Sequence, residues 1–161
     1  RSSNAVGYSV MTSVIAISNI AGGTHKSTVA HALSVAMVEY GKKVLLIDLD
    51  PRAELTFNLG FERSRETIFE MLNGSVLTSS NDITTDERFD FVGSDSRLSA
   101  LTQPDSLKTF LTSSAQKFDV VIVDTPSTID PRLAMAFHAA DAVLPAGAVH
   151  HHPCSCRGLD R

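Results

Sequence analysis

The chain has 161 residues, 43% hydrophobic and 20% charged, which is the balance of one globular domain large enough to bury a core. Its net charge of −4 excludes a global basic field of the kind that attracts nucleic acid or an anionic membrane. No apolar run reaches the roughly 20 residues that cross a bilayer. The two cysteines, Cys154 and Cys156, are too close for a disulfide framework, so we expect a reducing cytoplasm and no membrane.

In chain order, short apolar runs alternate with segments of helical spacing. We expect strands over 14–17, 44–47, 89–92, 120–123 and 142–144, and helices over 27–40, 66–72, 105–114 and 133–140. Strands that are apolar on both faces and separated by helices indicate an α/β fold with three layers. The prediction is a mostly parallel, twisted sheet with helices on both faces, in which the strands at Val14, Val44 and Val120 are central.

The two ends lack this periodicity, so the domain is expected to span residues 11–149. Residues 1–10 are interpreted as an upstream or cloning-derived segment without the apolar core of a secretory signal. Residues 150–161 contain three histidines and two cysteines, which are zinc and copper ligands. Because no fold frames these ligands, we favour an unstructured tail over a metal cluster.

A candidate phosphate-binding loop lies between the first strand and the first helix. Glycines let backbone N–H groups turn toward a phosphate, and a helix N-terminus adds unpaired N–H groups. Lys26 would reach the β- and γ-phosphates, and the Ser27 hydroxyl would ligate Mg²⁺. Alone, this loop is equally well interpreted as a plain turn, because Asn19 and His25 stand where the full pattern has glycines. The loop residues are Gly22, Gly23, Thr24, His25, Lys26, Ser27 and Thr28.

Carboxylates follow two of the later strands. Asp48 and Asp50, in the run DLDP, end the second strand, and Asp124 ends the run VVIVD. Such side chains can hold Mg²⁺ through water or orient an attacking water, although turn-forming residues also end strands without any function. Ligands of open parallel sheets bind beyond the carboxyl ends of the strands. A phosphate loop, an acidic pair and a further aspartate in this order therefore predict one magnesium–nucleotide crevice.

Four stretches, GGTHKST, KKVLLIDLDPRAELTFNLGF, FDVVIVDTPS and HAADAVLPA, together resemble the ParA/MinD family of deviant Walker A ATPases. Within that family the chain is most similar to ParA/Soj partition proteins, above all in DLDPRAELTFNLG with Thr56, Leu59 and Gly60 at the family spacing. The resemblance implies a cytoplasmic, nucleoid-associated P-loop ATPase of plasmid or chromosome partition. Such a protein dimerises over two ATP molecules with Mg²⁺, binds DNA non-specifically and is stimulated by a ParB-like partner.

The resemblance also implies roles for individual residues. Lys26 would hold phosphates, Ser27 would ligate Mg²⁺, and Thr28 would lie near the α-phosphate. Asp48 and Asp124 would support the metal through water. Asp50 would be the catalytic residue that positions the attacking water. Arg52 stands where partition ATPases usually have glutamine, and we assign it no role.

Three departures from the family predict impaired hydrolysis. Ala21 replaces the signature lysine that crosses the dimer interface, and such a charge is worth roughly 10³–10⁵ in rate. His25 replaces the glycine before Lys26, and its side chain should crowd the phosphate or distort the loop. The family sheet continues beyond residue 144 into a part that supplies adenine contacts, dimer surface and DNA-binding residues, so we expect the fold to be incomplete on its C-terminal side.

Other functions remain open. A pseudo-ATPase would bind nucleotide or a partner and hydrolyse nothing. A metabolic relative, such as a dethiobiotin-synthetase-like ligase, would share the crevice, but the partition-type DLDP stretch disfavours it. An iron-protein-like reductase is excluded, because residues 11–149 contain no cysteine to ligate an iron–sulfur cluster.

Overall fold

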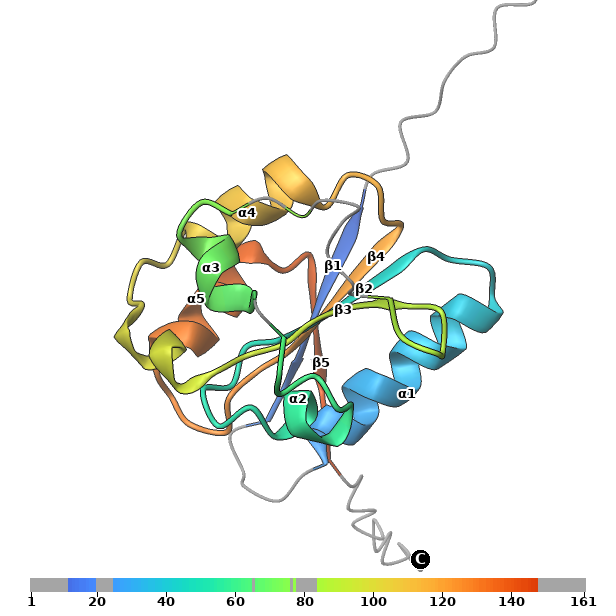
Figure 1. The fold of residues 1–161 in the computed structure, drawn as a ribbon, viewed down its shortest axis with the longest axis horizontal. Helices are drawn as coiled ribbons and strands as arrows, with labels where there is room; N and C mark the ends of the chain where they lie inside the picture. The colour runs from blue at the N-terminus through green and yellow to red at the C-terminus, as the bar shows by residue number, and fades with distance from the viewer. Residues whose placement is uncertain (1–11, 20–24, 65, 76, 78–83, 148–161) are drawn as a thin grey trace, which may run out of the picture.

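The computed structural model describes residues 12–19, 25–64, 66–75, 77 and 84–147, which form a parallel sheet covered by helices (Figure 1). The strand order is β3-β2-β4-β1-β5, and every pairing in it is parallel. The α/β prediction is therefore confirmed, as is the central position of β1, β2 and β4. The strands are β1 (Ser13–Ser18), β2 (Val44–Asp48), β3 (Asp90–Val92), β4 (Val120–Asp124) and β5 (Ala142–Pro145). The helices are α1 (Lys26–Glu39), α2 (Glu54–Asn58), α3 (Ile68–Leu72), η1 (Ser96–Ala100), α4 (Ser106–Ser114) and α5 (Pro131–Ala139).

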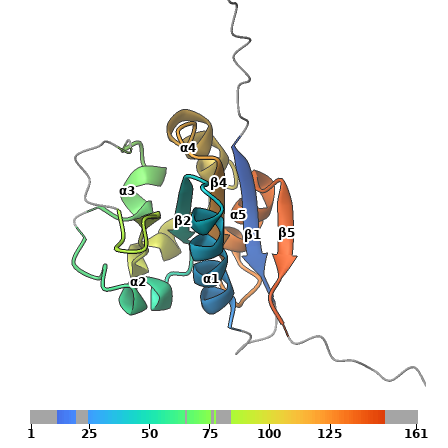
Figure 2. The same cartoon turned by 90° about the vertical axis from the view of Figure 1, so that its right-hand side faces the viewer.

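The sheet has a hydrophobic cluster on each face, because successive side chains of a strand point to opposite sides. On β2, Leu46 packs with α1 and α2, whereas Leu45 and Ile47 pack on the face that α3, α4 and α5 cover. Figure 1 shows α1 on one side of the strands and α4 and α5 on the other, and Figure 2 is seen from the side of α1, which lies in front of the strands. Burial on both faces explains why the sequence of β2 and β4 is continuously apolar rather than alternating.

Two short helices escaped the sequence analysis. Helix α2 and the 3₁₀ helix η1 have five residues each, too few to show a periodic apolar face. Helix α2 begins after Ala53 in a left-handed conformation (φ 55°), whereas the Asp95 side chain caps η1 by accepting from the backbone N–H of Arg97. The other predicted elements lie within two residues of the observed bounds, and the predicted end segments 1–10 and 150–161 lie outside the described residues.

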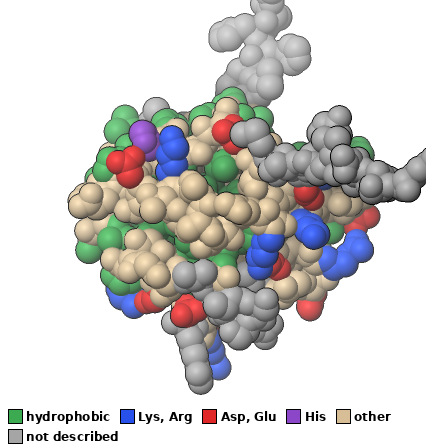
Figure 3. Space-filling view, turned by 90° about the horizontal axis from the view of Figure 1, so that it is seen from above, with side chains coloured by type: hydrophobic (Ala, Val, Ile, Leu, Met, Phe, Trp, Pro, Cys, Tyr) green, Lys and Arg blue, Asp and Glu red, His purple; other side chains and the backbone are tan. Residues whose placement is uncertain are grey.

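The surface seen from above in Figure 3 carries acidic and basic side chains interspersed among apolar and uncharged atoms. No block of one sign stands out on this face, in keeping with the modest net charge of −4. Among the described residues, no helix is long and apolar enough to cross a membrane.

Candidate functional site

The carboxyl ends of β2 and β4 bring two predicted site residues side by side. Asp48 lies directly opposite Asp124 in the parallel register, and both carboxylates are buried, at 0% and 1% exposure. Helix α1 starts above the same ends, and Ser27 in its first turn donates a hydrogen bond from Oγ to Asp124 Oδ2 at 2.5 Å. Residues 97 positions apart in the sequence thus meet at one point, as the predicted order of motifs required.

Lys26, the first residue of α1, is also buried in this crevice. Its ammonium Nζ donates to Ser127 Oγ at 3.0 Å, so the lysine lies toward the loop that follows β4. Among the described residues the printed hydrogen-bond partner of this ammonium is the neutral Ser127 hydroxyl, while the charge of Asp124 acts on it from farther away. An anion in direct contact with the ammonium would therefore lower its free energy.

Asp48 organises the turn that follows β2. Its Oδ1 accepts from the backbone N–H of Asp50 at 3.0 Å, and its Oδ2 accepts from the backbone N–H and the hydroxyl of Thr56 at 3.0 and 2.7 Å. The Thr56 hydroxyl in turn accepts from the Ser94 backbone N–H at 2.8 Å. Both oxygens of Asp48 are thereby occupied, which fixes the turn, α2 and the end of β3 relative to one another.

Burial dominates the titration of the two facing carboxyl groups. It raises the pKa of Asp48 to about 6, although the hydrogen bonds from Thr56 and Asp50 act in the opposite direction. Burial likewise raises the pKa of Asp124 to about 7; the Ser27 hydrogen bond opposes this shift, and the nearby Asp48 adds to it. The pair is therefore unfavourable in the doubly ionised form unless a cation lies close by.

The donor set around Asp124 fits Mg²⁺. Asp124 Oδ1 is buried and has no hydrogen-bond partner among the described residues, while Oδ2 is bonded to the Ser27 hydroxyl. Hydroxyl and carboxylate oxygens are ligands that Mg²⁺ accepts, and this ion usually keeps several waters. Within the described ranges, no three His, Cys, Asp or Glu side chains gather to hold a metal by themselves. A Mg²⁺ ion at this place would therefore complete its shell with water and phosphate oxygens.

Asp50, the predicted catalytic residue, is 8% exposed at the end of the same turn. Its carboxylate accepts from the backbone N–H of Arg52 at 3.0 Å and from the Arg52 guanidinium at 2.9 Å. The guanidinium Nη2 also donates to Ser127 Oγ at 2.9 Å. Arg52, to which we assigned no role from the sequence, thus lies between the predicted catalytic carboxylate and the acceptor of Lys26.

The loop before α1 is described only from His25 onward, so Gly22, Gly23, Thr24 and Ala21 lie outside the described residues. His25 precedes the helix with φ 54° and ψ 31°, in the left-handed region that glycine adopts freely. A side chain in this conformation costs roughly 1–2 kcal/mol. His25 therefore carries backbone strain at the start of α1. The crowding of a phosphate by its side chain stays a prediction. Thr28, in the first turn of α1, is exposed.

Several residues of the site gave little or no sequence signal. Ser127, Ser94 and Arg52 belong to turns, and only the tertiary fold brings them to the crevice. Thr56 stood out solely through its spacing after DLDP, which did not reveal its hydrogen bond to Asp48. The signal that could have found two of them is a hydroxyl residue soon after an acidic strand end, as Thr56 follows Asp48 and Ser127 follows Asp124.

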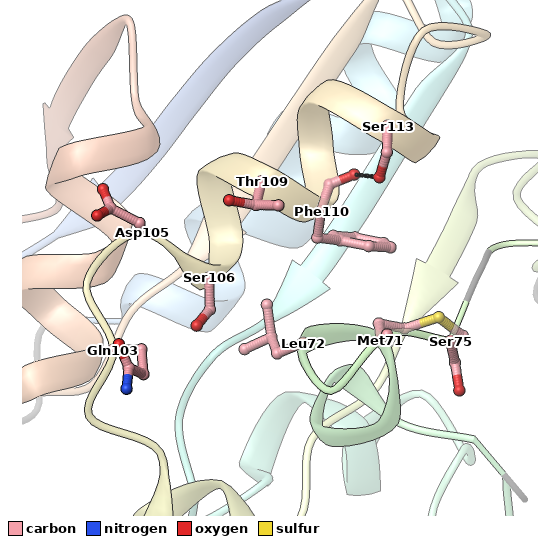
Figure 4. A pocket seen from close by; sticks show the side chains of 10 residues that line it. Met71, Leu72, Ser75, Gln103, Asp105, Ser106, Thr109, Phe110 and Ser113 are labelled. Atoms are coloured by element: carbon pink, nitrogen blue, oxygen red, sulfur yellow. Dashed lines mark hydrogen bonds between the residues drawn. The ribbon is translucent and has the colours of Figure 1, made fainter.

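A separate cavity of about 370 Å³ lies between α3 and α4, away from the crevice (Figure 4). Met71 and Leu72 face Phe110 across it, and the Ser113 hydroxyl donates to the Phe110 carbonyl at 2.9 Å. Asp105 is its single charged lining residue within the described part of the chain, so the cavity lacks the cations that a phosphate group requires.

Comparison with known proteins places this geometry in a family. The AAA domain family matches residues 12–161. The sporulation initiation inhibitor protein Soj of Bacillus subtilis is 28% identical over 145 residues, covering 83% of this chain and 57% of that protein. The chromosome-partitioning ATPase Soj of Thermus thermophilus is 31% identical over 137 residues, covering 81% and 52%. The chain thus spans somewhat more than half the length of these two relatives.

Solved structures agree with the fold. Cobyrinic acid a,c-diamide synthase from Mycobacterium smegmatis, with bound ADP and magnesium, superposes with a TM-score of 0.78 at 32% identity. The alignment covers 84% of this chain and 60% of that one. A putative plasmid partition protein from Borrelia burgdorferi, bound to AMPPNP, gives a TM-score of 0.70 at 30% identity, with 84% and 62% covered.

Proposed function

The chain belongs to the AAA domain family as a ParA/MinD-like P-loop ATPase similar to the partition proteins, and from this premise we propose its function. The crevice at the ends of β2 and β4 binds ATP with Mg²⁺, and the protein acts in plasmid or chromosome partition. Hydrolysis at this site is slow.

One observation carries the proposal: Ser27 Oγ lies 2.5 Å from Asp124 Oδ2, beside the buried Lys26. A lysine followed by a hydroxyl at a helix start, facing an aspartate at a strand end, is the arrangement by which P-loop proteins hold phosphates and Mg²⁺. The Borrelia partition protein with AMPPNP and the Mycobacterium synthase with ADP and magnesium support the same ligand class here.

Each residue then has a defined task. Lys26 holds the β- and γ-phosphates, and Ser27 and Asp124 hold Mg²⁺, which when bound offsets charge on the phosphates. Asp48 supports the metal only indirectly, through water, because its oxygens already accept hydrogen bonds from Asp50 and Thr56. Asp50 orients the attacking water once its carboxylate is free to accept a hydrogen bond. The loop residues Gly22, Gly23, Thr24, His25 and Thr28 surround the phosphates.

Two residues, His25 and Ala21, are the reasons why we propose slow hydrolysis. The strained backbone of His25 disfavours the loop conformation that seats the phosphates. Ala21 offers no cation to the transition state, where charge moves toward the leaving group. If these two residues abolish hydrolysis completely, the protein is a pseudo-ATPase that binds nucleotide without turnover. The superposition on the Mycobacterium synthase favours a ligase that uses the same ATP site as the second candidate.

Nucleotide titration tests the proposal. We expect AMPPNP to bind in calorimetry with Mg²⁺ present, to bind more weakly in EDTA, and to lose at least tenfold in affinity in Lys26→Ala. Lys117→Ala is the matched control, because Lys117 is half exposed and pairs with Asp90 rather than with crevice residues. Undiminished binding by Lys26→Ala would refute the site.

Reversion tests the hydrolysis claim. The double variant Ala21→Lys, His25→Gly should release phosphate faster than the parent chain, and Asp50→Ala should abolish that gain. Turnover in the parent equal to that of the revertant would show that both substitutions are tolerated. An inactive revertant that still binds AMPPNP would favour the pseudo-ATPase.

The proposed partners follow the family. The protein is proposed to form an ATP-dependent homodimer in the cytoplasm, to associate with nucleoid DNA and to respond to a ParB-like protein. DNA-stimulated phosphate release and sedimentation with AMPPNP would test these points.

A further inference from the structure

Two cations meet on one neutral oxygen in the crevice. Ser127 Oγ accepts from Lys26 Nζ at 3.0 Å and from Arg52 Nη2 at 2.9 Å. Like charges repel, and a hydroxyl is a weaker acceptor for each of them than an anionic oxygen. A phosphate oxygen in place of the hydroxyl would give both cations charge-assisted hydrogen bonds.

Arg52 belongs to a local motif that occurs at three places in the described part of the chain. In Asp50–Arg52, Asp95–Arg97 and Asp130–Arg132, the aspartate accepts from the backbone N–H of the arginine, and the guanidinium folds back onto the carboxylate. The motif alone therefore explains a stable turn and does not indicate a ligand.

The three arginines differ in the contacts that each guanidinium makes beyond the aspartate of its own motif. Arg97 makes a further contact with the Glu70 carboxylate, at 2.6 Å, and Arg132 donates to the Ser99 carbonyl, at 3.1 Å. Arg52 instead reaches a neutral hydroxyl already occupied by a lysine, and its further carboxylate contact, to Glu54, is long at 3.4 Å. Of the three arginines, Arg52 also has the most exposed side chain, at 58%, so it can shift toward an incoming group.

The charge balance of the crevice favours a second cation for phosphate. Asp48, Asp50 and Lys26 all lie close enough to Asp124 for their charges to act on it, so three acidic groups and one buried ammonium share the crevice. A triphosphate brings several negative charges into this setting. The guanidinium compensates Asp50, and its planar fork suits phosphate oxygens.

We infer that Arg52 is a second phosphate-binding cation, which together with Lys26 recognises the terminal phosphate of a nucleoside triphosphate. The inference rests on the proposed function. It places Arg52 at the terminal phosphate because that phosphate receives the attacking water, and the guanidinium is bonded to Asp50, the carboxylate proposed to orient that water. Arg52 thereby confers preference for triphosphate over diphosphate.

The test compares Mg²⁺–AMPPNP with Mg²⁺–ADP in calorimetric titrations of three variants. Arg52→Gln should weaken AMPPNP binding about tenfold and ADP binding less than about threefold, because loss of a charge-assisted contact affects only the ligand that makes it. Arg52→Lys should keep part of the preference. Arg97→Gln is the matched control, since Arg97 has the same motif and 52% exposure but contacts α3, and both affinities should be unchanged.

Three results would overturn the inference. Equal weakening of both nucleotides in Arg52→Gln would mean that Arg52 only maintains the turn, and unchanged affinities would mean that it makes no phosphate contact. Tighter AMPPNP binding would mean that Arg52 instead occupies Asp50 and obstructs the site. If the parent chain binds neither nucleotide, the proposed function fails and the inference with it. If Lys26→Ala weakens both nucleotides while Arg52→Gln has no effect, the inference alone fails.

Discussion

The central strands of the sheet and its edge strand β5 are built from the same apolar residue types but differ in burial. Strands β2 (VLLID) and β4 (VVIVD) are buried at every position, whereas β5 (AVLP) is exposed at every position. Within the described residues β5 pairs with β1 alone, and Val143 and Leu144 remain 49% and 40% exposed. An apolar run thus specifies a strand, but its neighbours decide whether that strand is core or edge.

The same comparison separates function from its surroundings. The buried central strands end in buried aspartates that carry a hydrogen-bond network, while β5 ends in Pro145 without an ionisable group. Rigid central strands hold Asp48 and Asp124 in register, and this precision is what a metal–phosphate site requires.

The largest expected difference between the two regions is in stability. Leu46→Ala in β2 removes a side chain that is fully buried against α1, and it should lower the free energy of unfolding by about 2–5 kcal/mol. Leu144→Ala in β5 is the matched control and should cost less than about 1 kcal/mol, because its side chain is already partly in water. Urea unfolding measures both, and similar losses would contradict the division into centre and edge.

A smaller effect on stability is expected at the end of β3, where Ser94 joins the hydrogen bonds of Asp48 and Thr56. A Cβ added at Gly93 would lie 2.8 Å from Thr56 Cγ2, so Gly93→Ala should displace the hydroxyl that supports Asp48. We expect a loss of roughly 1–3 kcal/mol. Thr56→Ser removes the clashing methyl and keeps the hydroxyl, so the double variant should recover part of the loss. Simple additivity in this double-mutant cycle would contradict the proposed contact.

The third effect is on pH dependence. The folded-state pKa values of Asp48 and Asp124 are raised to about 6 and about 7, above the ordinary value of 3.8, so the folded protein binds these protons more tightly than the unfolded chain. Without Mg²⁺, stability should therefore fall as the pH rises from about 4 to about 7 and then level off. At roughly 1.4 kcal/mol per unit of pKa shift, the loss amounts to about 2–4 kcal/mol for each group. Melting temperatures between pH 5 and 8 measure this.

Asp124→Asn serves as the control for that slope. The variant should lose the part of the slope that arises above pH 6, and it should be at least as stable as the parent at pH 8. Stability that rises with pH in the parent over this range would show that the two carboxylates are better compensated than their burial indicates.

The sequence predicted most of the fold. Parallel strands that are buried on both faces are continuously apolar, and the longer helices between them have apolar residues at helical spacing. The sequence also predicted the meeting of Ser27 with Asp124, since parallel strands place their carboxyl ends on one edge. It did not reveal α2 or η1, whose five residues are too few to show a clear helical period. The exposure of β5 agrees with the expectation that the fold is incomplete on its C-terminal side. Nor did the sequence reveal Arg52 at the crevice, because the Asp-x-Arg spacing occurs at Asp50, Asp86, Asp95 and Asp130 and looks the same at each of them.

Amide hydrogen exchange with and without Mg²⁺–AMPPNP tests the central claim most directly, because it reads the crevice and the other regions in one experiment. The account predicts slower exchange on ligand addition in residues 25–30, 48–56 and 124–127. It predicts no change in β5 or along the cavity between α3 and α4, where phosphate-binding cations are lacking among the described lining residues. Protection centred on that cavity, with residues 25–30 unchanged, would contradict the assignment of the nucleotide site.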